Sequence, residues 1–323
     1  MPDAFTTTAS LDYDQTMWDQ GIYFSLRPEL HFDSFADVKS TTASPDQGAA
    51  LTFTIVTDMA AATASINESV DVDAVALADT QVTVTLAEKG NAVNSTWRVR
   101  ATAFIGLDPV IANAVGFNAG MSLDLIARTE LEAGTNVRYG SAQGAAGTPT
   151  ARNQVDPADL IRAHDVRLVV ADLKAANVPP FNGYYAGVIH PHVTVDLREE
   201  TGSASWRDPH TYSQPAEIWA GEVGEFEGVR WMSSSRASLW ADAGSSTTLT
   251  DVYGTIVFGH QAVAKGYSSY DGRGPLPITI IGPVVDKLRR FKPVGWHWFG
   301  GYKRFREAAI RRIESSSSMG VNV

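Results

Sequence analysis

The sequence predicts an α+β protein, and three observations carry that prediction. Residues 51–56 and 82–86 alternate apolar with polar side chains, as half-buried strands do. Residues 107–134 carry apolar side chains at helical spacing, which predicts a helix of about 26 residues, roughly 39 Å long. Short stretches of β character then follow toward the C-terminus. Strands that are grouped apart from a long helix are typical of the α+β class.

Length and composition exclude several classes of protein. The 323 residues are 44% apolar and 19% charged, which is enough for one or two domains with a real core. The chain has no cysteine, so disulfides, cysteine nucleophiles and thiolate zinc sites are excluded. The first residues carry no secretory signal, and no run reaches the roughly 18 uninterrupted apolar residues of a membrane span. We therefore expect a protein that is used without export and outside membranes.

The charge is distributed unevenly along the chain. The net charge is −10, which argues against a sequence-wide nucleic-acid binder. Residues 1–97 hold 3 basic and 14 acidic side chains, whereas residues 283–314 hold 9 basic and 3 acidic ones. Two interpretations stay open: the acidic front and the basic back attract each other between copies, or both are solvated faces.

The first fifty residues are predicted to form an extended arm. Short polar stretches separate isolated apolar anchors, with a short helix possible at residues 17–26 before Pro28. The anchors include Trp18, Tyr23 and Phe24. Such a segment buries little surface by itself, so we expect it to lie on its own body or on a neighbour.

Residues 51–104 are predicted to form a long hairpin or extended loop. The two strands named above are followed by turn chemistry at residues 89–91 and by a return strand at residues 97–104. Between the strands, acidic residues punctuate a stretch rich in valine and alanine: Glu68, Asp71, Asp73 and Asp79.

The long helix has recognisable ends. Asp108 is a suitable N-cap, Pro109 would occupy the first helical position, and Gly134 follows the last periodic residue. Gly116 and Gly120 each cost about 1 kcal/mol against alanine, which suggests that another backbone crosses closely there.

Further elements follow at shorter spacing. A second helix is predicted over residues 156–176, before Pro179 and Pro180. Residues 305–314 are ambiguous between helix and strand. Strands are predicted at residues 185–189, 192–197, 229–232, 252–264 and 278–285.

One cluster has a catalytic pattern. On a strand, His190, His192 and Asp196 would point to one face, which is how β-barrel metal sites gather ligands. The alternative, which we favour, is a structural entry into a strand with Pro191 at its start. No other histidine is placed by spacing to complete a metal site.

Two other groups of residues could serve in catalysis or in binding a partner. The carboxylates of residues 217–227 could form an acid/base pair, although a solvated acidic loop is favoured. Basic and aromatic residues interleave at 289–292 and 296–298, as in single-strand binders and in protein interfaces. No nucleophile elbow and no phosphate-binding glycine loop is present.

The order of several segments resembles one family. The segments are Ile-Asn-Glu-Ser-Val-Asp at 66–71, residues 82–93, 107–139, Ile-His-Pro-His-Val at 189–193, Gly-Glu-Val-Gly at 221–224, 228–231, 252–259 and Val-Gly-Trp at 294–296. This series is similar to the major capsid proteins of tailed bacteriophages, in the branch typified by the coliphage N-four capsid protein. The resemblance covers roughly residues 50–315.

The resemblance implies the Hong Kong 97-like capsid fold. Its parts would be an N-terminal arm (1–50), an extended β loop (51–104), a peripheral domain with a long spine helix (105–155), an axial domain mixed with returning peripheral strands (156–275), and peripheral strands with the C-terminal tail (276–323).

The function that the resemblance implies is that of a virion shell subunit. Copies would assemble in the host cytoplasm into hexamers and pentamers of an icosahedral head, with weak, non-specific contact with packaged double-stranded DNA. Further partners would be a portal and, where present, separate scaffolding and decoration proteins. No catalytic residue, metal, cofactor or membrane contact is expected. The candidate inter-subunit contacts are Trp18, Tyr23, Phe24, Glu68, Asp71, Asp73, Lys89, Arg289, Arg290 and Lys292.

Two features of the family are not expected here. The arm begins almost at Met1, so a cleaved scaffolding segment is not expected. Lys89 and Asn91 lie in the predicted loop, but nothing in the matched motifs assigns them to an isopeptide crosslink, so we expect none.

Two other classes remain as alternatives. One is a metal-dependent β-barrel enzyme that uses His190, His192 and Asp196. The other is a different virion component, such as a tail or decoration subunit, or an adhesin.

Overall fold

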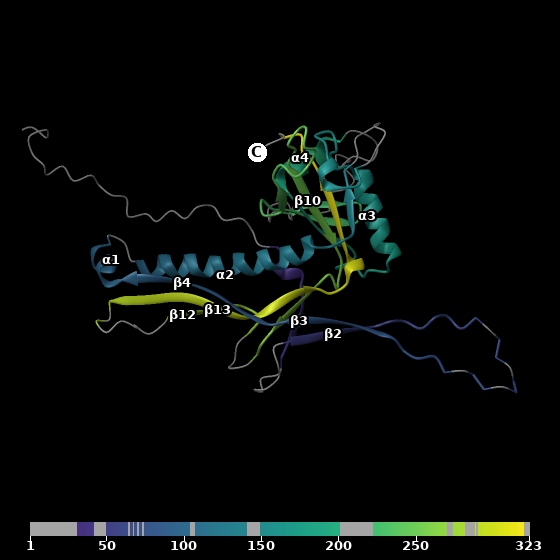
Figure 1. Ribbon diagram of the computed structural model, residues 1–323, viewed down its shortest axis with the longest axis horizontal. Helices are drawn as coiled ribbons and strands as arrows, with labels where there is room; N and C mark the ends of the chain where they lie inside the picture. Colours follow the sequence, from purple (N-terminus) through teal and green to yellow (C-terminus); the bar gives the residue numbers. More distant parts are fainter. Residues whose placement is uncertain are drawn as a thin grey trace, which may run out of the picture.

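The computed structural model shows an elongated molecule with a compact body on one side of its long axis (Figure 1). It describes residues 31–41, 50–103 apart from 64, 67, 70 and 73, 107–140, 149–200, 222–269, 274–281, 288 and 290–319. The arm expected over residues 1–50 lies mostly outside this set, and Trp18, Tyr23 and Phe24 lie outside it entirely.

The long axis is built from one helix and one sheet. The predicted helix is confirmed as α2 (Leu107–Glu132), which begins one residue before the expected N-cap Asp108. It runs along β4 (Ala87–Thr96) and β13 (Phe291–Arg304), which pair antiparallel over ten residues (Figure 1). The indole Nε1 of Trp296 donates to Asn118 Oδ1 at 2.9 Å, so β13 is fixed to the helix by a hydrogen bond as well as by packing.

Among the described residues, the sheet of the long axis contains five strands. Its order is β1 (Asp37–Ser40), β11 (Val263–Tyr267), β13 and β12 (Ile278–Ile281), and β4 also pairs with β13. Strand β12 is the last strand of this order, and all four of its residues are exposed.

Strand pairing and a buried ion pair hold residues 31–41 on this sheet. Strand β1 pairs parallel with β11, and Lys265 Nζ donates to both carboxylate oxygens of Asp33, at 2.7 and 3.0 Å. The hydroxyl of Tyr302 also donates to Asp33. Lys265 is 3% exposed, and a buried ammonium needs such a partner. The described end of the predicted arm therefore lies on the chain's own body.

A separate hairpin projects from the same region. Strands β2 (Ala50–Val56) and β3 (Asp79–Thr85) pair antiparallel over seven residues, which confirms the strands predicted there. Residues 57–78 join the two strands along the chain, and those of them that the structure describes extend away from the body (Figure 1). We call these residues the hairpin loop.

The compact body contains a sheet with seven strands in the part of the chain that the structure describes. Its order is β5 (Val137–Tyr139), β14 (Ile310–Ser315), β10 (Val252–Phe258), β6 (Tyr185–Ile189), β8 (Val229–Ser233) and β7 (Glu222–Phe226), with β9 (Ser238–Trp240) on β10. Helices α3 (Ala163–Ala175) and α4 (Pro191–Glu199) lie beside it (Figure 1). Every residue of β6 and β10 is buried.

Several predicted elements differ from the structure. The turn expected at residues 89–91 lies in the middle of β4, because pairing with β13 overrides its turn residues. The return strand expected at 97–104 is the helix α1 (Trp97–Thr102), whose N-cap Thr96 accepts the N–H of Val99. The helix expected from 156 begins only at Ala163.

Three further features also differ from the predictions. The strand predicted over 252–264 is two strands, β10 and β11, in different sheets. The ambiguous segment 305–314 becomes a short 3-10 turn followed by β14. A Cβ added at Gly116 would meet nothing within 4 Å, so the close backbone crossing expected there is wrong.

Helix α2 is long and apolar enough over residues 109–132 to cross a membrane, judged by length and composition alone. That criterion is weak for a single helix, since the core helix of a folded domain meets it too. Here one side of α2 packs along β4 and β13.

Candidate interaction surfaces

The histidine cluster does not have the predicted strand geometry. His192–Leu197 is helical and belongs to α4, so the expectation that His190, His192 and Asp196 share one strand face is wrong. Pro191 is the first helical residue and His190 is the N-cap, whose Nδ1 accepts the N–H of His192 at 3.2 Å. The segment thus starts a helix instead of a strand.

Each member of the cluster has a structural partner. His192 Nδ1 lies 3.0 Å from the hydroxyl of Tyr253 on β10. Asp196 accepts the N–H and the hydroxyl of Ser318, so it holds the C-terminal segment against α4. Burial, and then the proximity of His192, lowers the pKa of His190 to about 4. Among the described residues, no group of three His, Asp or Glu side chains could hold a metal ion.

The acidic segment predicted as a possible acid/base pair is also structural where it is described. Glu227 pairs with Arg167 of α3 at 2.9 Å, and Glu225 lies in β7 opposite Arg230. Glu217 lies outside the described residues.

The acidic contact candidates lie in the hairpin loop. Glu68 and Asp71 are exposed, and every other described residue of 57–78 is exposed as well. Asp73 lies outside the described residues. The loop sequence contains Asp58, Glu68, Asp71 and Asp73, and no lysine or arginine. It is therefore a purely anionic extension.

The basic contact candidates lie at the opposite end of the long axis, near α1 and the start of β13 (Figure 1). Arg290 is exposed, and its carbonyl oxygen accepts the N–H of Trp97 at 2.7 Å. Lys292 is half-buried, and its carbonyl oxygen accepts the hydroxyl of Ser95. Arg289 lies outside the described residues. Lys89, which was expected in the loop, is half-buried in β4 opposite Trp298.

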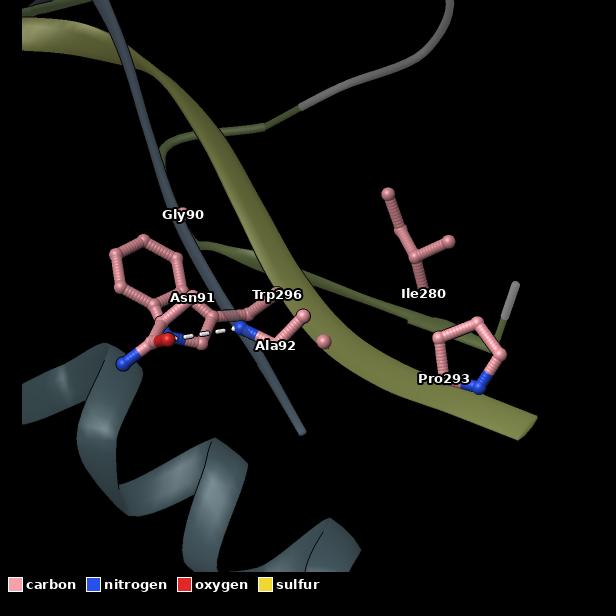
Figure 2. A pocket seen from close by; sticks show the side chains of 7 residues that line it. Gly90, Asn91, Ala92, Ile280, Pro293 and Trp296 are labelled. Atoms are coloured by element: carbon pink, nitrogen blue, oxygen red, sulfur yellow. Dashed lines mark hydrogen bonds between the residues drawn. The ribbon is translucent and has the colours of Figure 1, made fainter. Parts of the chain in front are cut away.

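We call the end of the long axis with α1, β12 and the start of β13 the basic end. It carries a hollow whose floor consists of small residues. It has a volume of about 450 Å³ and is lined by Gly90, Asn91, Ala92, Ile280, Pro293, Gly295 and Trp296 (Figure 2). Gly295 is paired with both Ala92 on β4 and Ile280 on β12, so these three positions share one sheet face. A Cβ added at Gly295 would lie 2.8 Å from Ala92 Cβ, so only glycine fits at position 295.

The hollow opens away from the helix. In Figure 2, Trp296 and Asn91 lie on the side of β13 that faces α2, whereas Ile280 and Pro293 lie on the other side. We call this recess, which Ile280 and Pro293 border on the outer face, the small-residue hollow. It was not predicted from the sequence, although glycines such as Gly90 and Gly295 within strands are a signal for close backbone approach.

Exposed apolar side chains gather at both ends of the molecule. In and beside the hairpin loop they are Val56, Met59, Ile66, Val72, Val75 and Leu77. At the basic end they are Val93, Trp97, Val99, Leu276, Ile278, Ile280, Ile281, Leu288 and Phe291. Large exposed apolar patches mark interaction sites in soluble proteins.

Comparison with known proteins agrees with an interaction role. A family model described as "Phage capsid protein" matches residues 33–321. The chain belongs to the phage capsid protein family. No curated protein matches this capsid protein.

Solved structures share the fold along almost the whole chain. The capsid of Ralstonia phage GP4 is 14% identical with a TM-score of 0.77, and the match covers 98% of this chain and 99% of that one. The capsid of cyanophage Pam1 is 16% identical with a TM-score of 0.73, covering 99% and 100%. The head of Helicobacter pylori bacteriophage KHP40 is 12% identical with a TM-score of 0.70, covering 97% and 99%. The mixed α/β architecture is thus that of phage capsid structures.

Family membership settles the class of function. The protein is a major capsid protein, a structural and non-enzymatic component of a virion whose copies form a shell. The paired histidines belong to the fold of its compact body.

Proposed function

We propose that copies of this chain tile the icosahedral head of a tailed phage as hexamers and pentamers around double-stranded DNA. The architecture would be Hong Kong 97-like, with the five parts predicted from the sequence, and the branch would be that of the coliphage N-four capsid protein. Support comes from the family match and from the shape of the subunit. It is elongated, and its two ends differ in charge and both expose apolar side chains. Such a subunit suits head-to-tail contacts, which close into rings when the rotation between copies allows.

The observation that carries this proposal is the hairpin loop. Five large apolar side chains are exposed there in a single copy, and the described residues of 57–78 form no strand. Burying one such side chain stabilises by about 1.5–3 kcal/mol, so the loop could gain on the order of 10 kcal/mol in a shell before the cost of association. A single copy leaves that gain unused.

Charge would set the register of the contact. The anionic loop, with Glu68, Asp71 and Asp73, would meet the basic end of a neighbour that carries Arg289, Arg290 and Lys292. Lys89 of β4 and the arm residues Trp18, Tyr23 and Phe24 remain candidate contacts.

The other partners follow from the same role. A portal, and separate scaffolding and decoration proteins where the phage has them, would contact the shell, which would assemble in the host cytoplasm. Contact with the genome would be weak and independent of sequence, because the net charge of the chain is −10.

The test is assembly of a charge-reversed variant. Arg289→Glu, Arg290→Glu and Lys292→Glu together should reduce the particle yield in negative-stain images at least tenfold and leave the unassembled chain soluble. The matched control is Lys174→Glu with Lys303→Glu, two exposed positions away from the basic end, which should assemble as the wild type does.

Three outcomes would contradict the proposal. An unchanged yield of the triple variant would remove the charge argument. Tubes or small oligomers of the wild type, instead of closed particles, would indicate a tail or decoration subunit. Stoichiometric metal in the purified protein would favour an enzyme.

A further inference from the structure

One pair of side chains joins the segment before β1 to the sheet of the long axis at contact distance. Lys265 on β11 is 3% exposed, and its Nζ donates to both carboxylate oxygens of Asp33, at 2.7 and 3.0 Å. The side chain of Asp33 is 27% exposed. Because Nζ is close to both oxygens, it also lies beside the carboxyl carbon Cγ that carries them.

The surroundings hold this pair in place and keep most water away from the amine. The rings of Trp298 and Tyr302 lie 5.7 and 5.4 Å from the Nζ of Lys265. The parallel pairing of residues 37–40 with residues 264–267 fixes the two segments that carry the pair. Groups that are held in contact in a fixed orientation react far faster than the same groups free in solution.

Tyr302 places a hydrogen-bond donor on the carboxyl group. Its hydroxyl donates to Oδ1 of Asp33. Burial, and then the nearby charge of Asp33, raises the pKa of Tyr302, so the hydroxyl stays protonated and remains a donor. A donor in this position draws electron density from Cγ and stabilises the negative charge that develops on the oxygen when a nucleophile adds to the carbon.

We propose that Lys265 and Asp33 join in an intramolecular isopeptide bond, with Tyr302 as the donor that assists its formation. The ammonium first gives a proton to the carboxylate, which leaves a neutral amine and a neutral acid. Nζ then adds to Cγ, and the hydroxyl of Tyr302 holds the oxygen that becomes negative. The other oxygen takes a second proton from the nitrogen, the bond from Cγ to this oxygen breaks, and water leaves. The product is an amide, and no further reactant is needed.

The bond would relieve the cost of a buried ion pair. Two charges that have been taken out of water carry a desolvation penalty, and a neutral amide in the same place does not. The partial exposure of Asp33 gives the released water a way out. Both residues belong to one chain, so the bond does not link subunits and does not depend on the proposed shell function.

The intact mass of the purified, denatured full-length chain tests the proposal. It should lie below the mass of the sequence by one water molecule, and tandem mass spectrometry of a digest should find the peptide of Asp33 joined to the peptide of Lys265. Lys265→Arg keeps a cation beside Asp33 but offers no amine, so it should have the full mass of its sequence. Asp33→Asn should lose ammonia instead of water and give the same linked peptides.

The rate of linking tests the role of Tyr302. In pulse-labelled chains of Tyr302→Phe, the linked fraction should grow at least tenfold more slowly than in the wild type, because the donor to the carboxyl oxygen is missing. Tyr185→Phe is the matched control, since it removes another buried hydroxyl, which donates to the carbonyl oxygen of Val178. Its rate of linking should equal that of the wild type.

Two results would overturn the proposal. A wild-type chain that keeps its full mass after long incubation has an ion pair only. A water loss that persists in Lys265→Arg would come from cyclisation of Asp33 onto the N–H of Ser34. If Lys265→Arg does not fold, Asp33→Asn decides: linked peptides with loss of ammonia support the bond, and their absence overturns it. Particle formation is a separate measurement, so a failure of the isopeptide bond leaves the shell function in place.

Discussion

The seven-stranded sheet and the hairpin loop place apolar side chains in opposite environments. All residues of β6 and β10 are buried within the body, whereas every described residue of 57–78 is exposed. A single copy buries the apolar side chains of the first region but leaves those of the second region exposed to solvent. We therefore expect burial within the compact body to stabilise the fold of this capsid protein, and contacts at the two ends of the long axis to stabilise its assembly.

The largest expected effect comes from the compact body. Trp231 is fully buried on β8, and its ring occupies the space left by Gly187, where an added Cβ would lie 2.7 Å from the indole. Trp231→Ala should lower the free energy of unfolding by about 3–5 kcal/mol in urea titrations of the unassembled chain. Trp97→Ala is the matched control, since Trp97 is 69% exposed, and should change it by less than about 0.5 kcal/mol. Equal losses of unfolding free energy in the two variants would contradict the contrast between the buried body and the exposed end.

An intermediate effect should appear as pH dependence of the compact body. Burial lowers the pKa of His190 from 6.5 to about 4, so the unfolded chain binds this proton first. The free energy of unfolding contributed by His190 is therefore complete above pH 6.5 and is lost as the pH falls toward 4. Asp165 acts in the opposite sense, because burial raises its pKa to about 6 and protonation then favours the folded state.

A variant isolates the histidine contribution. His190→Asn keeps an N-cap side chain for α4 and removes the titration. Between pH 6.5 and 4 its stability should fall less than that of the wild type, with Asp165 contributing equally to both. Parallel stability curves would show that His190 does not titrate in this way.

The smallest effect on folding is expected in the hairpin loop. Ile66→Ala should leave the free energy of unfolding of the unassembled chain within about 0.5 kcal/mol, because its side chain has few contacts to lose. Ile256→Ala, the same change at a position that is 1% exposed in β10, should cost about 2–5 kcal/mol. The reverse ranking would show that the loop belongs to the folding core of one copy.

Regular elements with strong local signals could be predicted from the sequence. The strands of the hairpin and the helix α2 agree with their alternation and helical spacing, and α2 ends before Gly134 as its C-terminal signal indicates. The strand predicted at residues 192–197 is wrong, because their alternation was given more weight than Pro191, which is a signal for a helix start and lies at the first helical position.

The candidate surfaces could be predicted only in part. The sign of charge at the two ends follows from the sequence, and Glu68, Asp71, Arg290 and Lys292 lie at those ends. The small-residue hollow depends on which strands pair with β13, and this long-range pairing leaves no local pattern in the sequence. For the same reason Lys89 was expected in a turn but lies in a paired strand.

Amide hydrogen exchange of unassembled and assembled protein tests the central claim most directly. Amides of residues 57–78 and of β12 should exchange at least tenfold more slowly in particles than in the unassembled chain, since a neighbour then covers both ends. Amides of β10 should be protected equally in both. Loop and β12 amides that exchange as fast in particles as in the free chain would contradict the account.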